Sequence, residues 1–309
     1  MTTWDEVAQD PNYIKVLDKG FVGLVDKMGN DKAIVQAARV SYGDGTKSVN
    51  EDRGLIRYLM RHQHSTPFEM VEFKFHLKMP IFVMRQHVRH RMSSINEYSG
   101  RYSVMTDEFY IPETSRLQAQ SSDNKQGSAG QLEGQELEMA LNTIQRVSAE
   151  NYLDYLSLIN DPGGRDYNLG ERQGLARELA RMVLPVNNYT ELYWKIDLKN
   201  LFHYLNLRAD SHAQYEIQAL ANPIGEFVRK SCPIAWEAFE DYWLHSVSVS
   251  RQEQFLFAAI VAISNSRAIS ISSSFDQLCI EAGGKKGLRE EYNMSSREFA
   301  EFEKRWKLA

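Results

Sequence analysis

Cysteine is nearly absent from this 309-residue chain, which has only Cys232 and Cys279. Two cysteines cannot build a disulfide framework or a cysteine-based zinc site. Long apolar runs are missing as well, because the most apolar stretch, Phe255 to Ile263, is far shorter than the ~20 residues that span a bilayer. The opening residues, MTTWDEVAQDPNY, include acids and no apolar h-region. We therefore expect no signal peptide, no membrane contact and a cytoplasmic location.

An excess of positive charge is also missing, since the formal net charge is -5. Such a chain lacks the global positive field of a protein that coats nucleic acid, so we expect no nucleic-acid partner. Any anion that it binds must meet a local cluster of arginines. The motifs G-x-G-x-x-G and H-E-x-x-H are absent too. No Rossmann site is therefore indicated, and His62, His64, His87 and His90 are better explained as polar lining or helix surface than as a metal site.

The residues that are present predict an α+β fold that is rich in helix and has a small sheet. Apolar and polar residues alternate from Val71 to Met79, which predicts a half-buried strand. Shorter strands are predicted at 21–25 and 189–196, and residues 115–135, rich in Gln, Ser and Gly, are predicted to form an exposed loop. Helical patterns dominate elsewhere, at 31–42, 81–89, 136–158, 170–183, 198–209, 234–245, 250–264 and around Phe299 to Trp306.

Several helix ends carry recognisable signals. Asp31 and Asp197 are predicted N-caps, and Ser48 has capping-box spacing to Glu51. Ser211 is predicted to cap a helix that Pro223 interrupts.

The densest polar cluster lies at residues 85–102, which read RQHVRHRMSSINEYSGRY. Phe82, Gln86 and Arg89 fall at i, i+4 and i+7, so one helical face offers an amide and a guanidinium to a planar ligand. The loop that follows adds hydroxyls, Gly100 and Arg101. Arginine forks suit phosphate, because two parallel N–H donors meet two oxygens. A solvated basic patch is an equally good interpretation of this cluster alone.

The cluster resembles the signature of the flavin-dependent thymidylate synthases, because Arg89-His90-Arg91 is followed after seven residues by Ser99. Three further blocks resemble the same family in its order and spacing: RHQHSTPFE at 61–69, LARELARMVLP at 175–185 and LFHYLNLRADSHAQYEI at 201–217. The resemblance covers about residues 12–240. It implies a catalytic domain over residues 1–245, and it leaves residues 246–309 as a helical C-terminal extension of unknown role.

The resemblance also implies the ligands. The family binds FAD as cofactor, dUMP as substrate, and methylenetetrahydrofolate and NADPH as co-substrates, and it forms homotetramers with active sites at subunit interfaces. The residues matching its dUMP contacts are Gln86, His87, Val88, Arg89, Glu97, Tyr98, Ser99, Gly100, Arg101, Arg181 and Arg208. Those matching its FAD contacts are Thr66, Arg89, His90, Arg91, Glu97, Asp197, Leu198, Lys199 and His203. Family members often have Asn and Arg where this chain has Asp197 and Lys199. His64 matches a histidine near the flavin and folate pocket, and no metal is implied.

Arg208 is also a candidate on physical grounds. It continues the helical stripe of Leu198, Leu201 and Leu205, so its guanidinium is predicted to be partly buried and to need a partner. Asp210 is the simplest partner, in a structural ion pair. The resemblance implies a catalytic one, since a fixed cation beside uracil lowers the pKa of the N3–H group and favours electron density at C5.

Other interpretations stay open. The arginine cluster could belong to a nucleotide- or RNA-binding module without catalysis, or the histidines to a metal-dependent nucleotide hydrolase. Cys232 precedes Pro233 at a predicted helix start, where a thiolate is favoured, although a lone cysteine is more often inert packing.

Overall fold

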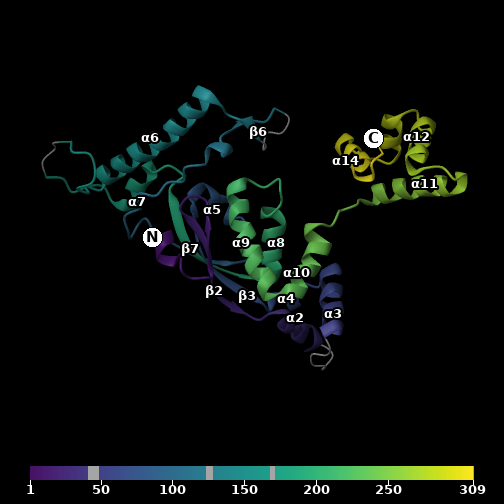
Figure 1. The fold of residues 1–309 in the computed structure, drawn as a ribbon, viewed down its shortest axis with the longest axis horizontal. Helices are drawn as coiled ribbons and strands as arrows, with labels where there is room; N and C mark the ends of the chain where they lie inside the picture. Colours follow the sequence, from purple (N-terminus) through teal and green to yellow (C-terminus); the bar gives the residue numbers. More distant parts are fainter. Residues whose placement is uncertain (41–48, 123–127, 168–170, 309) are drawn as a thin grey trace. The chain divides into compact units, whose positions relative to one another are not determined.

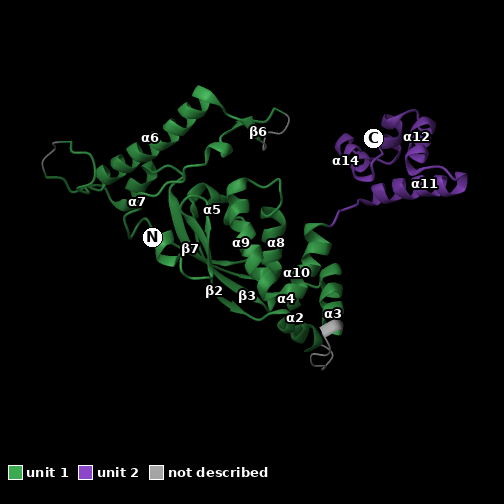
Figure 2. Ribbon diagram, in the orientation of Figure 1, with its two compact units in different colours: residues 1–245 green, residues 246–309 purple. Residues whose placement is uncertain are grey.

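The computed structural model describes residues 1–40, 49–122, 128–167 and 171–308. The chain divides into two compact units, residues 1–245 and 246–309 (Figure 2). The division coincides with the boundary drawn from the sequence, and the roles assigned to the two parts remain predictions.

A five-stranded antiparallel sheet forms the centre of the first unit, in the order β1-β2-β3-β7-β4. The central strand, β3 (Glu72–Pro80), is the alternating segment of the sequence, and β7 (Tyr189–Asp197) pairs with it along its whole length. β2 (Gly20–Met28) lies on the other side of β3, next to β1 (Tyr13–Val16). β4 (Ser94–Glu97) pairs with β7 and forms one edge. The strand predicted from the alternation is confirmed, but the expectation of half-burial is wrong for its second half, where His76 and Lys78 on the opposite face are buried as well.

Helices cover one face of this sheet, as Figure 1 shows for α8 and α9. Phe73, Phe75 and Leu77 of β3 are fully buried in the main core, because the odd-numbered residues of the strand share that face. The core is completed by apolar residues of α2 (Asp31–Arg39), α3 (Val49–Arg61), α4 (Thr66–Glu69), α5 (Ile81–His87), α8 (Leu198–Arg208), α9 (Tyr215–Ser231) and α10 (Pro233–Phe239).

A smaller apolar cluster lies beside the sheet. It joins the long helix α6 (Gly134–Leu158), through Tyr155, to Met105 and to Ala180 of the short helix α7 (Arg177–Ala180). Outside these elements, the first unit has a short N-terminal helix, α1 (Trp4–Val7).

Some predicted boundaries are wrong for local reasons. The helix predicted at 170–183 begins only at Arg177, where α7 is followed by a 3-10 turn, Arg181–Val183. Gly174 explains this, because its φ is +76° and a Cβ there would lie 2.8 Å from the carbonyl of Ile159. Residue 170 lies outside the described residues.

The loop predicted at 115–135 contains a two-stranded hairpin, β5 (Gln118–Gln120) and β6 (Ser128–Gln131). Pro223 does not interrupt α9, whose packed face of Leu220, Ile224 and Phe227 outweighs the loss of one helical hydrogen bond.

The predicted caps have mixed outcomes. Asp197 caps α8 by accepting from the Asn200 amide at 2.9 Å, as predicted. Asn30, rather than Asp31, caps α2, and Asp31 instead accepts from the first amides of α10. α9 begins after Gln214, well past Ser211. Ser48 lies outside the described residues.

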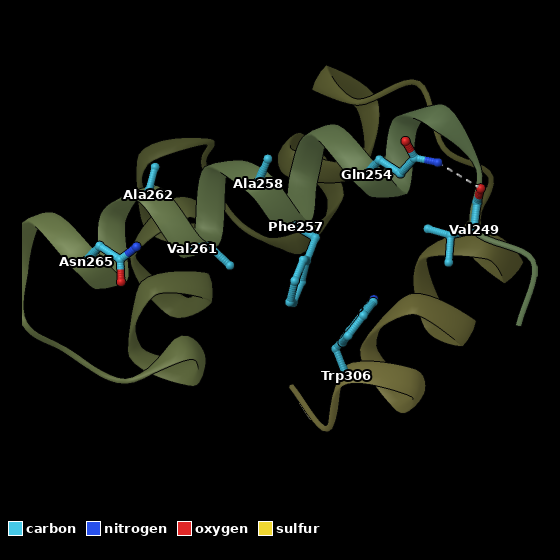
Figure 3. Close-up of a pocket in the computed structure, with 8 residues that line it drawn as sticks. All are labelled: Val249, Gln254, Phe257, Ala258, Val261, Ala262, Asn265 and Trp306. Carbon is cyan, nitrogen blue, oxygen red and sulfur yellow. Dashed lines mark hydrogen bonds between the residues drawn. The ribbon is translucent and has the colours of Figure 1, made fainter.

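The second unit has a core of its own, built around Phe275, Phe299 and Phe302. Its helices are α11 (Arg251–Arg267), α12 (Ile271–Glu281), α13 (Lys285–Glu291) and α14 (Ser296–Trp306). Capping boxes at the N-termini of α11 and α14 satisfy free backbone amides there and so define where each helix begins. A surface pocket of about 740 Å³ lies between α11 and the end of α14, where Phe257 stacks on Trp306 (Figure 3).

Among the described residues, no single helix has the length and apolar composition to cross a membrane. One pair, α11 with α12, meets both criteria when taken together, but the two helices are bent by 110°.

Candidate functional site

The first part of the candidate site is the helix α5, which follows the central strand directly. Pro80 occupies the N-cap of α5, and the buried side chains of Val83, Met84 and His87 fix the helix against the core. Gln86 is therefore left on the other side, where its amide donates to Oε1 of Gln214 at 2.5 Å. Gln214 in turn donates to Glu216 at 2.8 Å.

The signature residues that follow α5 separate into buried and exposed groups. Arg89 and Arg91 are exposed, as is Val88, whereas His90 is only 7% exposed. Exposed guanidiniums are available to an anionic ligand at little desolvation cost.

Two buried histidines of this segment are held neutral. His87 is fully buried between the rings of Trp194 and Tyr204, and burial, with His90 and Arg208 nearby, lowers its pKa to about 3. Burial and the charge of Arg208 lower the pKa of His90 to about 4. Both imidazoles are therefore neutral acceptors and donors at physiological pH.

Arg208 contacts His90. Its Nε donates to Nε2 of His90 at 3.0 Å, which fixes the proton of the neutral imidazole on Nδ1. Asp210 is not its partner, because that carboxylate accepts from His212, 2.8 Å away. The simplest partner considered from the sequence is thus wrong. In the described part of the chain, the terminal nitrogens of the half-buried Arg208 have no hydrogen-bond partner.

The second part of the candidate site is the turn after β4, residues 97–101. Glu97 ends the edge strand, and its Oε1 accepts from the Thr190 hydroxyl at 2.7 Å. The Tyr98 hydroxyl donates to the Val104 carbonyl at 2.8 Å. The Ser99 carbonyl accepts from the amides of Tyr102 and Ser103 at 3.1 Å each, which closes a tight turn.

Gly100 allows two parts of the chain to meet closely. A Cβ at this position would lie 2.9 Å from Sδ of Met105 and 3.2 Å from Cδ of Arg181. A larger residue would thus push Arg181 away from the turn at residues 97–101. Gly100 and Arg181, which lie far apart in the sequence, are brought together as neighbours.

The remaining arginine of the loop faces α7. Arg101 forms an ion pair with Glu178 at 3.3 Å, with both side chains more than half exposed. Beside it, Arg177 donates to the Tyr102 carbonyl at 3.1 Å. Arg101 and Arg177 both line a polar pocket of about 420 Å³. Arg177 was not among the residues predicted from the sequence, although its position one helical turn before Arg181 was an available signal.

The other predicted flavin residues lie at the start of α8 and at α4. Both oxygens of Asp197 are bonded to Asn200, and Lys199 also donates to Asn200, at 3.3 Å. Leu198 is buried in the core, and His203 lies 5.7 Å from the ring of His90. Thr66, at the start of α4, is exposed, as is His64.

The contacts of the described site residues fall into two sets within one chain. One group holds His90, His203 and Arg208, and the other holds Gly100, Arg101 and Arg181. No hydrogen bond or ion pair between described residues joins the two groups.

Comparison with known proteins identifies the family. The family model described as thymidylate synthase complementing protein matches residues 23–234. The chain is 55% identical over 237 residues to a flavin-dependent thymidylate synthase of Ruegeria pomeroyi, covering 77% of this chain and 76% of that one. This chain belongs to the flavin-dependent thymidylate synthase family. A Thermus thermophilus protein with the same name is 54% identical over 245 residues, covering 79% of this chain and 84% of its own.

Solved structures agree with this assignment. The crystal structure of a UMP/dUMP methylase, PolB from Streptomyces cacaoi bound with 5-Br dUMP, superposes with a TM-score of 0.65 at 32% identity. The match covers 76% of this chain and all of PolB. The expected α+β fold, rich in helix and with a small sheet, is confirmed for a flavin-dependent thymidylate synthase.

The described residues fit the flavin of this family. Nδ1 of His90 is buried and has no partner among the described residues. Because Nε2 of His90 accepts from Arg208, Nδ1 carries the proton and can donate to a carbonyl or ring nitrogen of a flavin. The exposed Arg89 and Arg91 can meet the pyrophosphate. No group of His, Cys, Asp and Glu among the described residues is arranged to hold a metal ion.

Proposed function

We propose that this chain converts dUMP to dTMP by reductive methylation. Methylenetetrahydrofolate donates the carbon, and FAD, reduced by NADPH, donates the hydride. The observation that supports this most directly is the arrangement of Arg208 on neutral His90, a fixed cation with two free terminal nitrogens. The cofactor performs the redox chemistry, while the protein supplies orientation and charge.

The physical role of Arg208 follows from its contacts. A neutral acceptor orients the guanidinium through Nε without cancelling its charge, whereas a carboxylate partner such as Asp210 would form an ion pair with it. The remaining nitrogens then face a ligand with a full positive charge. Beside uracil, such a charge favours the N3-deprotonated ring and raises electron density at C5, where the methyl group is formed.

The dUMP itself is assigned to residues 97–101, which we call the substrate loop, together with α5. In this proposal, Gln86, Arg89, Arg101 and Arg181 contact the nucleotide, with the guanidiniums on its phosphate. Glu97, Tyr98, Ser99 and Gly100 complete the loop, and His87 and Val88 contribute through the α5 end. The residues assigned to FAD are Thr66, His90, Arg91, Asp197, Leu198, Lys199 and His203, together with Arg89 and Glu97, which contact both ligands in this proposal. His64 is assigned to the flavin and folate pocket.

We further propose a homotetramer with shared active sites. Two features support it: no hydrogen bond or ion pair among the described residues joins the Arg208 group to the Arg101 group, and large apolar side chains are exposed beside them. Met92 is 70% exposed and Tyr102 77% exposed, on either side of the edge strand β4. A partner copy covering this edge would bury both and could complete each site with its own arginine.

The test is the visible spectrum and activity of the purified protein. A flavin spectrum with FAD, and dTMP formed from dUMP only when both methylenetetrahydrofolate and NADPH are present, is the expected result. A colourless protein without FAD affinity would refute the proposal. Metal analysis separates the alternatives, since bound metal with nucleotide hydrolysis indicates the hydrolase, and nucleotide binding without turnover indicates a binding module.

A further inference from the structure

Two consecutive residues of β7 hold the beginning of the substrate loop. Thr190 donates its hydroxyl to Oε1 of Glu97 at 2.7 Å. The backbone carbonyl of Glu191 accepts from the amide of Tyr98 at 2.8 Å. Residues 97 and 98 are therefore each fixed by one residue of the neighbouring strand, at the point where the strand ends and the loop begins.

The hydroxyl of Thr190 is a fixed anchor for an otherwise exposed side chain. Thr190 is only 2% exposed, and β-branching restricts its χ1 rotation within a strand. Glu97 lies on the edge strand, whose four residues are all exposed. Within the described part of the chain, Thr190 is the one side chain that donates to the Glu97 carboxylate.

The strand beneath this anchor is itself fixed by a polar network on the sheet face opposite the helices. The Glu191 carboxylate accepts from His76 at 2.7 Å and from the Thr2 amide and hydroxyl at 2.6 and 2.8 Å. Fully buried Lys78 donates to the Thr2 carbonyl at 2.7 Å and to Glu108 at 2.8 Å. Burial raises the pKa of Glu191, but the hydrogen bonds from His76 and Thr2 outweigh it and lower the pKa to about 2, so the carboxylate stays charged.

We propose that Thr190 is a positioning residue of the dUMP site, whose hydroxyl holds the Glu97 carboxylate in the orientation that receives the nucleotide. The inference rests on the proposed function, because Glu97 is assigned to the ligand there. Without the hydroxyl, the carboxylate rotates freely and must be ordered each time dUMP binds. That cost falls on ground-state binding, so it affects KM and Kd for dUMP more than kcat.

The test is Thr190→Val, which removes the hydroxyl and keeps the branched shape. At saturating FAD, we expect KM and Kd for dUMP to rise by up to about tenfold, the scale of ordering one mobile side chain on binding, with kcat changed less than about twofold. Thr190→Ser restores a hydroxyl and should recover most of the affinity. If the valine variant does not fold, the smaller Thr190→Ala carries the same test.

Two controls separate positioning from general damage. Thr106→Val removes a comparable bond, from the Thr106 hydroxyl to Glu108 at 3.1 Å, outside the substrate loop, and should leave KM for dUMP unchanged. In a Glu97→Ala background, Thr190→Val should have no further effect on KM, because its partner is already gone.

The outcomes are distinct. Any one of three results overturns the positioning role while the wild-type enzyme remains active. They are a wild-type KM for dUMP in Thr190→Val, a raised KM that Thr190→Ser does not restore, and an undiminished effect of Thr190→Val in the Glu97→Ala background. A wild-type protein that binds FAD but forms no dTMP overturns the proposed function, and the positioning role with it.

Discussion

The buried imidazole of His87 should make the protein less stable at mildly acidic pH. Its pKa falls from the ordinary 6.5 to about 3 in the folded protein. Below pH 6.5 the unfolded chain binds a proton at this residue and the folded chain does not. The unfolded state therefore gains free energy, so stability present above pH 6.5 is lost as the pH falls toward 3.

The magnitude follows from the two pKa values. Between pH 7.5 and 5.5, one such histidine costs about 1.4 kcal/mol of unfolding free energy, because the unfolded group crosses its pKa while the folded group stays neutral. His90, with a pKa of about 4, contributes a similar amount, so the two together cost roughly 3 kcal/mol. Carboxyl groups titrate mainly below this window.

The perturbation is His87→Phe, which keeps a ring between Trp194 and Tyr204 and removes the titrating group. The assay is urea unfolding of the FAD-free protein at pH 7.5 and 5.5. The variant should lose about 1.4 kcal/mol less than the wild type between the two pH values, whatever its stability at pH 7.5. His62→Phe, at the exposed end of α3, serves as the matched control and should keep the wild-type difference. A variant with the full wild-type loss would refute the reasoning.

Three further predictions concern the site. Arg208→Lys should retain FAD yet lose most dTMP formation, because an ammonium cannot both donate to His90 and present a planar fork; near-normal turnover contradicts this. Cys232→Ala combined with Cys279→Ala should stay active, since both thiols are buried with raised pKa values, to about 12 for Cys232; a folded, FAD-loaded but inactive variant points to cysteine catalysis. Arg101→Ala and Arg208→Ala should each be nearly inactive. If the sites are shared, the two variants co-expressed in oligomers of wild-type size should regain partial activity. If both arginines come from one chain, the mixed oligomers should regain no activity.

Local sequence patterns predicted which helices and strands form more reliably than they predicted where each one begins and ends. The alternation of β3 and the Asp197 cap of α8 depend on neighbouring residues, so both could be predicted. The start of α7 could not be predicted in this way, because it depends on the close approach of Gly174 to the carbonyl of Ile159 in another segment. The predicted interruption at Pro223 was wrong for the same reason, because the tertiary packing of α9 outweighs the local tendency of proline to break a helix.

The partners of the site residues were harder to predict than the residues themselves. The helical stripe predicted that Arg208 would be partly buried, and proximity in sequence suggested Asp210 as its partner. The observed partner, His90, lies 118 residues away on the segment after α5. Only the folded arrangement of α5 and α8 beside β7 brings the two together.

That difference changes the chemistry expected at the site. An Asp210 partner would form an ion pair and weaken the influence of Arg208 on a ligand. A histidine whose pKa is lowered to about 4 accepts the hydrogen bond as a neutral group, so the guanidinium keeps its whole charge near the ligand. Burial keeps both His90 and His87 neutral, and both are therefore expected to lower stability in acid. The acid sensitivity predicted for the fold and the free charge proposed for Arg208 therefore have one physical origin, the burial of these two imidazoles.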